Sequence, residues 1–124
     1  MIHVDTSALV ASLTGRRTSA PVMRSFISDG IRLGVSAPVL YEWLRGPRVS
    51  DELAAQELLL PSGAAFAFGV DEATLAADLY RRMKRPRGRE MDIAIAACAI
   101  VNHASLWTLN PGDFSDIPGV ALVP

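Results

Sequence analysis

Carboxylate and amide side chains occur in four short stretches that lie far apart along this chain: VDTSAL, YEWLRG, EMDIAIAACA and TLNPGDF. They carry Asp5, Glu42, Asp92, and the pair Asn110 and Asp113. Carboxylates that share one pocket repel one another, and a bound cation relieves this repulsion. An oxygen-only set of ligands favours Mg²⁺ or Mn²⁺. The pattern therefore predicts a site for one of these ions, provided that folding brings the stretches within a few ångströms.

A parallel sheet flanked by helices is the arrangement that would collect these stretches. The strand-like segments are MIHV, IRLGVSA, AAFAFGV, SLWTL and GVALV, and helical patterns begin near Thr6, Ala20, Pro38, Ser50, Asp71 and Glu90. Strands that alternate with helices in this way predict an α/β fold with a parallel sheet.

The carboxyl ends of parallel strands share one edge of the sheet, where ligands bind. Asp5 lies at the end of the first strand, which is normally central in such a sheet. Glu42 follows the second strand, Asp92 lies in the first turn of an apolar helix, and the TLNPGDF segment follows the fourth strand. All four stretches are therefore expected at the same edge.

Each of these residues also has an ordinary structural explanation. Asp5 fits the cap of the helix near Thr6, and Glu42 fits an ion pair with Arg45. Asp92 suits the positive end of its helix, and Asn110 suits the first position of a turn. For each residue taken singly, the structural explanation is preferable to a metal-binding role. Together, these explanations do not account for the fact that all four stretches are expected at the same edge of the sheet.

The aromatic and histidine residues are expected mainly in the core. His3 and His103 receive structural roles, and Trp107 is expected to be buried in its strand. Trp43 fits either ordinary helix packing or a partner surface, and the sequence leaves both open.

Basic residues are unevenly distributed, although the formal net charge is only −1. Arginine can hold a phosphate at two points. An arginine-rich loop on an otherwise neutral protein is therefore a candidate contact for nucleic acid. Clusters of this kind are also common as solvated surface between elements. The candidates for contact with a nucleic-acid backbone are Arg45, Arg48, Arg81, Arg82, Lys84, Arg85, Arg87 and Arg89.

Length and composition indicate one globular domain over residues 1–124. The longest apolar run, MDIAIAACAIV, contains an acid and is far below the ~20 residues of a membrane helix. No secretory signal is visible at the N-terminus, so we expect a cytoplasmic protein without a membrane partner.

The four stretches, in this order and in a chain of this length, resemble those of the PIN-domain ribonucleases. More narrowly, they are similar to the VapC-type toxins of toxin–antitoxin pairs, and the similarity covers nearly the whole chain. The resemblance implies a three-layer α/β/α sandwich with a central parallel sheet, and an acidic pocket that binds Mg²⁺ or Mn²⁺ and hydrolyses RNA phosphodiester bonds.

The resemblance also implies roles for individual residues. The family's acidic positions fall on Asp5, Glu42 and Asp92, and the fourth falls on Asn110 or Asp113. Thr6 or Ser7 matches the residue that orients a metal-bound water or the first carboxylate. Relatives form homodimers and are inhibited by a small VapB-type antitoxin, so a second copy, an antitoxin and RNA are the expected partners.

Two other interpretations remain open from the sequence. Asp5 and Asp71 resemble the phosphate-accepting aspartates of receiver-type signalling domains, although the only lysine, Lys84, lies in the basic loop. Alternatively, Asn110 marks the decay of the metal pocket, and the chain is an inactive α/β module that binds RNA or a partner.

Overall fold

The structure of the chain is a computed structural model that describes residues 1–124. Its helices are α1 (Thr6–Leu13), α2 (Ala20–Ser28), α3 (Ala37–Arg45), α4 (Ser50–Leu59), α5 (Val70–Arg82) and α6 (Glu90–Val101). The strands are β1 (Ile2–Val4), β2 (Leu33–Gly34) and β3 (Ser105–Trp107), and short 3-10 helices lie at η1 (Ser62–Ala64) and η2 (Pro111–Asp113). All six expected helices are present, and they begin within a residue or so of the predicted positions.

Local signals explain where several helices begin. Proline occupies the first turn of α2 and of α3, where its missing N–H costs nothing. At the start of α5, the Glu72 carboxylate accepts a hydrogen bond from the Gly69 N–H at 3.0 Å. Glu52 does the same for the Val49 N–H of α4 at 2.9 Å. These acids satisfy donors that the first turn of a helix leaves without partners.

The sheet is parallel, in the order β2-β1-β3, so the first strand is central as expected. The five-strand prediction was wrong in extent, because the segments AAFAFGV and GVALV each contribute only one bridge. Phe66 pairs with Ser36 beside β2, and Leu122 pairs with Leu106 beside β3. The Phe66 ring lies over Gly34, where an added Cβ would come within 2.9 Å of it. Because η1 precedes Phe66 and α5 follows it closely, few residues around Phe66 are extended.

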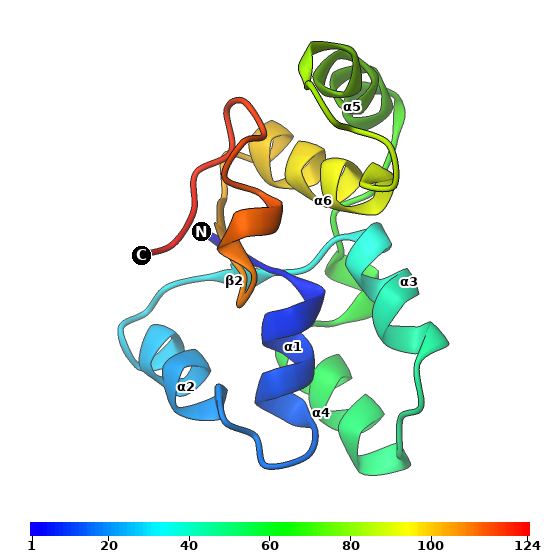
Figure 1. The fold of residues 1–124 in the computed structure, drawn as a ribbon. Helices are drawn as coiled ribbons and strands as arrows, with labels where there is room; N and C mark the ends of the chain where they lie inside the picture. Colours follow the sequence, from blue (N-terminus) through cyan, green and yellow to red (C-terminus); the bar gives the residue numbers. More distant parts are fainter.

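Helices surround this small sheet in the α/β/α arrangement that the sequence predicted. Figure 1 shows α1, α2 and α4 gathered at one end of the molecule, and α6 lying beneath α5 at the other. α6 contacts β3, α3 and α5. None of the helices has the length and apolar character needed to cross a bilayer.

The core explains why α6 is apolar all round. Ile95, Ala96 and Ala99 are fully buried between α5 and the sheet. Trp43 is also fully buried, so helix packing is the correct choice for this residue. Trp107 is buried as predicted, with its ring edge-on to that of Phe26.

His3 is fully buried in β1, and neither ring nitrogen has a hydrogen-bond partner. Its ring stacks on Phe66 with a centroid distance of 5.9 Å. Burial lowers the pKa of His3 to about 4, because the charged imidazolium would lose its hydration. This histidine is therefore a neutral core residue, as the sequence indicated.

The buried imidazole predicts a loss of stability in acid. The unfolded chain binds a proton at His3 near pH 6.5 and the folded chain only near pH 4, so stability falls as the pH drops through this window. Relative to His3→Leu, the free energy of unfolding should fall by about 3 kcal/mol between pH 7 and pH 4. Urea unfolding of both proteins across this range measures the difference, and parallel curves would contradict the assignment.

Candidate metal and nucleic-acid site

Asp5 lies at the carboxyl end of the central strand and is only 5% exposed. Its backbone N–H donates to the Trp107 carbonyl at 2.9 Å. Its Oδ2 accepts hydrogen bonds from Ser7 Oγ at 2.9 Å and from Thr108 Oγ1 at 2.7 Å. The side chain makes no capping bond to α1. The ordinary explanation of Asp5 as a helix cap is therefore not observed, and the carboxylate is oriented instead by hydroxyls from two elements.

Thr108 is the residue at this site that sequence reasoning missed. Its hydroxyl donates to Asp5 and accepts a hydrogen bond from the Asn110 N–H at 3.0 Å, while Ser7 Oγ accepts one from the Leu109 N–H at 3.0 Å. The available signal was its position one residue after β3, the strand that pairs with β1. A hydroxyl residue at that position lies beside the end of the neighbouring strand, where Asp5 presents its carboxylate.

Glu42 reaches the same edge from α3. Thr6 Oγ1 donates to Glu42 Oε1 at 2.6 Å, and Glu42 Oε2 lies 3.6 Å from Arg45 Nη2. The predicted ion pair with Arg45 is therefore present, but the shorter contact is with the residue that follows Asp5. The two hydroxyls that the sequence singled out have separate tasks, because Ser7 orients Asp5 and Thr6 orients Glu42.

Asp92 lies in the first turn of α6, half-buried. Its pKa is raised to about 6, first by burial and then by the negative charges of Asp113, Asp5 and Glu42, while Arg89 acts in the opposite direction. Charges raise one another's pKa in this way only when they lie near one another or in a shielded pocket. The fold therefore places the four acids in one electrostatic neighbourhood.

The TLNPGDF segment begins directly after β3 and forms the turn that follows it and η2. The Asn110 carbonyl accepts a hydrogen bond from the Asp113 N–H at 3.0 Å, so Asn110 does serve the turn. Both side chains are exposed. Among the neighbouring carboxylates, Asp113 has the largest effect on Asp92, so the negative charge of this segment acts from Asp113.

The donor atoms at this edge are carboxylate, hydroxyl and amide oxygens, which are the ligands that Mg²⁺ and Mn²⁺ prefer. As the side chains stand, no three His, Cys, Asp or Glu groups converge closely enough to hold an ion by themselves. The acids are therefore more widely spaced than the expected few ångströms. Mg²⁺ suits such a site, because it keeps several waters and needs only a few carboxylates.

The predicted RNA-contacting residues fall into two groups. Lys84, Arg85 and Arg87 are exposed and make no ion pair. The others have partners within the chain. Arg81 and Arg82 pair with Asp78, Arg45 stacks on Tyr41, Arg48 stacks on Trp43 and donates to its carbonyl, and Arg89 pairs with Asp116.

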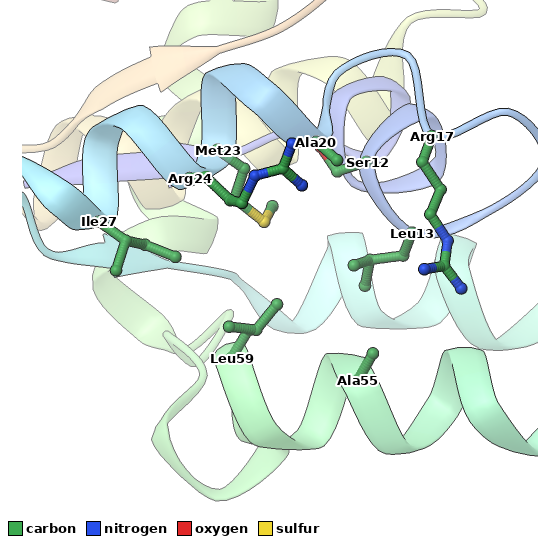
Figure 2. A pocket seen from close by; sticks show the side chains of 9 residues that line it. All are labelled: Ser12, Leu13, Arg17, Ala20, Met23, Arg24, Ile27, Ala55 and Leu59. Atoms are coloured by element: carbon green, nitrogen blue, oxygen red, sulfur yellow. The ribbon is translucent and has the colours of Figure 1, made fainter.

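A cavity of about 270 Å³ lies apart from the acids, between α1, α2 and α4. Figure 2 shows its lining: apolar side chains, including Met23, Ile27 and Leu59, form most of the wall, and Arg17 and Arg24 stand at its margin. The cavity offers an apolar surface to a partner, and its charged margin favours a partner with acidic residues.

Comparison with known proteins shows the family to which this chain belongs. Residues 2–120 match the model of the PIN domain. The chain is 34% identical over 117 residues to Ribonuclease VapC19 of Mycobacterium tuberculosis, an alignment that covers 93% of each protein.

Solved structures show the same fold. VapBC2 from Rickettsia felis, solved with a promoter DNA fragment, superposes with a TM-score of 0.78 at 20% identity, over 99% of this chain and 98% of the other. A toxin–antitoxin complex from Klebsiella pneumoniae gives 0.75 at 22% identity, over 98% and 96%. The receiver-type interpretation is overturned by these matches, and Asp71 lies exposed in the first turn of α5.

The raised pKa of Asp92 predicts that its charge destabilises the metal-free fold. The folded protein holds the Asp92 proton up to about pH 6, and the unfolded chain holds it only to about pH 3.8. The stability that protonated Asp92 gives the fold is therefore present in acid and is lost as the pH rises through 6. In EDTA, Asp92→Asn should therefore gain about 1 kcal/mol relative to wild type between pH 4 and 7.5, a value reduced from the full shift because the carboxyl is half exposed.

Asp71→Asn is the matched control, because Asp71 also lies in a first helical turn but is not among the charges that act on Asp92. Urea unfolding at both pH values gives the difference for each variant. An equal gain in the two variants would show that repulsion among the acids is not its source.

Proposed function

The chain belongs to the PIN-domain family, in the group of the VapC ribonucleases, and on this basis we propose that it is a metal-dependent endoribonuclease, the toxin of a toxin–antitoxin pair. One observation carries the proposal: Asp5 makes no capping bond to α1, and its carboxylate is held by Ser7 and Thr108 near three other acids. A purely structural aspartate at this position would cap α1. The cytoplasm is the proposed place of action, since RNA is the substrate.

The residues of the pocket have separable tasks in this proposal. Both hydroxyl contacts to Asp5 fall on Oδ2, which leaves Oδ1 as the ligand oxygen. Asp92 and Asp113 supply the other charged ligands, and Asn110 is at most a neutral one. Glu42, oriented by Thr6, positions the attacking water or helps to hold a second ion.

Mg²⁺ or Mn²⁺, when bound, lowers the pKa of water and stabilises negative charge on the departing oxygen. No histidine is required, and His3 has no access to the pocket because it is fully buried. The protein keeps Asp5 fixed and Asp92 partly shielded from water, so the site does not have to reorganise as charge develops.

The RNA backbone is proposed to approach over Lys84, Arg85 and Arg87, which lie in the loop leading to Asp92 and are not paired within the chain. Arg45 is exposed, with a long contact to Glu42 and a stack on Tyr41 as its partners within the chain. Arg48 is occupied by Trp43, so we give it a structural role. Contacts of this kind strengthen binding and make it sensitive to salt.

The proposed partners are a second copy of the chain and a VapB-type antitoxin. The cavity between α1, α2 and α4 fits an amphipathic helix of the antitoxin, whose apolar residues would cover Met23, Ile27 and Leu59. Acidic residues on the same helix would face Arg17 and Arg24.

Asp5→Asn should abolish RNA cleavage without unfolding the protein, because it removes the ligand charge and keeps the shape. Mutation of a residue that hydrogen-bonds to a metal ligand commonly lowers activity by 10- to 100-fold. Loss of the ligand itself should therefore lower the cleavage rate by more than about 100-fold. Thr108→Val should lower it by about 10-fold, since Asp5 stays but loses one orienting bond.

Cleavage of structured RNA with and without Mg²⁺ or Mn²⁺ measures these effects. Asp51→Asn, an exposed residue in the first turn of α4, is the matched control. Unchanged cutting by Asp5→Asn would reject the pocket. Tight RNA binding by wild type, with neither metal binding nor cleavage, would favour the inactive module.

Ile27→Glu should weaken binding of the antitoxin encoded beside the gene, because it places a charge in the apolar cavity. We expect the Kd to rise by about 30-fold or more, as for a well-packed interface residue. Leu58→Glu is the control, since Leu58 is 82% exposed and does not line the cavity. Calorimetry gives both affinities, and equal effects of the two variants would place the antitoxin elsewhere.

A further inference from the structure

Arg89, the residue before α6, holds the segment that carries Asp113. Its Nη1 donates to Asp116 Oδ2 at 2.8 Å and its Nη2 to Asp116 Oδ1 at 2.6 Å, a two-point contact between guanidinium and carboxylate. The same Nη2 donates to the backbone carbonyl of Asp113 at 2.7 Å. The Arg89 side chain is 23% exposed and that of Asp116 is 56% exposed, so the contact is open to solvent mainly on the Asp116 side.

We propose that Arg89 is a positioning residue, which uses Asp116 to aim the Asp113 carboxylate at Asp92 and thereby completes the acidic pocket. The inference rests on the proposed function and deepens it. It removes Arg89 from the group of arginines expected to contact RNA.

The backbone around Asp113 shows how the contact restricts the point from which the side chain starts. The N–H of Asp113 donates to the Asn110 carbonyl at 3.0 Å, and its carbonyl accepts from Arg89. With the peptide groups on both sides of the Cα held, both backbone torsions are restricted, and so is the direction of the Cα–Cβ bond. The buried residues Phe114 and Ile117 anchor the segment to the core, and the Arg89 contact adds a restraint at the Asp113 carbonyl itself.

The contact also explains why Arg89 differs from its basic neighbours. A guanidinium holds a phosphate through the same pair of N–H groups that it uses for a carboxylate. In Arg89 the two terminal nitrogens are already bonded to Asp116, whereas Lys84, Arg85 and Arg87 have no ion pair. Arg89 further adds a positive charge near Asp92, which opposes the repulsion from the other acids.

The expected consequence lies in metal affinity and turnover rather than in global stability. Exposed ion pairs contribute little to folding, and the Asp116 side chain is 56% exposed. Residues that orient metal ligands commonly change metal affinity or activity by 10- to 100-fold. Loss of the contact should therefore loosen Asp113 while the fold persists.

Two variants break the contact in different ways. Asp116→Asn keeps the positive charge of Arg89 but weakens the two-point pair, and Arg89→Lys keeps the charge but cannot form the pair. Arg32→Lys is the matched control, because Arg32 is exposed and precedes β2, at the opposite edge of the sheet. The readouts are Mn²⁺ affinity by calorimetry, exchange of the Ser115 amide, and kcat and KM for RNA cleavage.

Both variants should raise the Kd for Mn²⁺ by about 10-fold and lower kcat similarly, with KM changed less than about twofold. The Ser115 amide, which donates to the Pro111 carbonyl at 2.9 Å, should exchange faster. A raised KM with unchanged kcat and Mn²⁺ affinity would make Arg89 an RNA contact and overturn the proposal. If wild type binds Mn²⁺ but cuts no RNA, the proposed function fails, and weaker Mn²⁺ binding by the variants would still support the positioning role.

Discussion

The fixed position of Asp5 is the constraint on which the rest of the site depends. Its N–H is bonded to β3 through Trp107, and its carboxylate is bonded to Thr108, one residue further on. The same few residues therefore join the central strand, the start of α1 and the segment that leads to Asp113. Because the backbone and the side chain of Asp5 are held by one neighbouring strand, a change in strand register would disturb both together.

The second feature of the site is unrelieved repulsion. Folding gathers acids that the solvated chain keeps apart, and burial together with their negative charges raises the pKa of Asp92, so ionised Asp92 costs the fold free energy. The cost is local, because a core of apolar residues from α6 and the sheet lies beneath the pocket. A protein that tolerates such repulsion without using it would be unusual, since perturbed pKa values concentrate at functional sites. In the proposed function, this repulsion has a use in binding a divalent ion.

The basic residues cluster in the sequence, but they have different roles in the structure. Arg89 is engaged with Asp116 and the Asp113 backbone, Arg48 covers the buried Trp43, and Lys84, Arg85 and Arg87 remain free. Their side chains are chemically almost alike, and they differ only in what the fold places next to them. Charge clustering in a sequence therefore predicts a region of positive surface but not which guanidinium is available to a phosphate.

The sequence by itself determined the α/β class, the starts of the six helices and the parallel sheet with a central first strand, because these follow from local signals and hydrophobic periodicity. It also led to the family through four motifs in a characteristic order. Only the tertiary structure decided that the third and fifth strands shrink to single bridges, that Thr108 holds Asp5, and that Asp113 is the acid whose charge raises the pKa of Asp92 most. Those facts depend on pairings between segments that are well separated in the chain, by 103 positions in the case of Thr108 and Asp5, and no local stretch of the sequence encodes them.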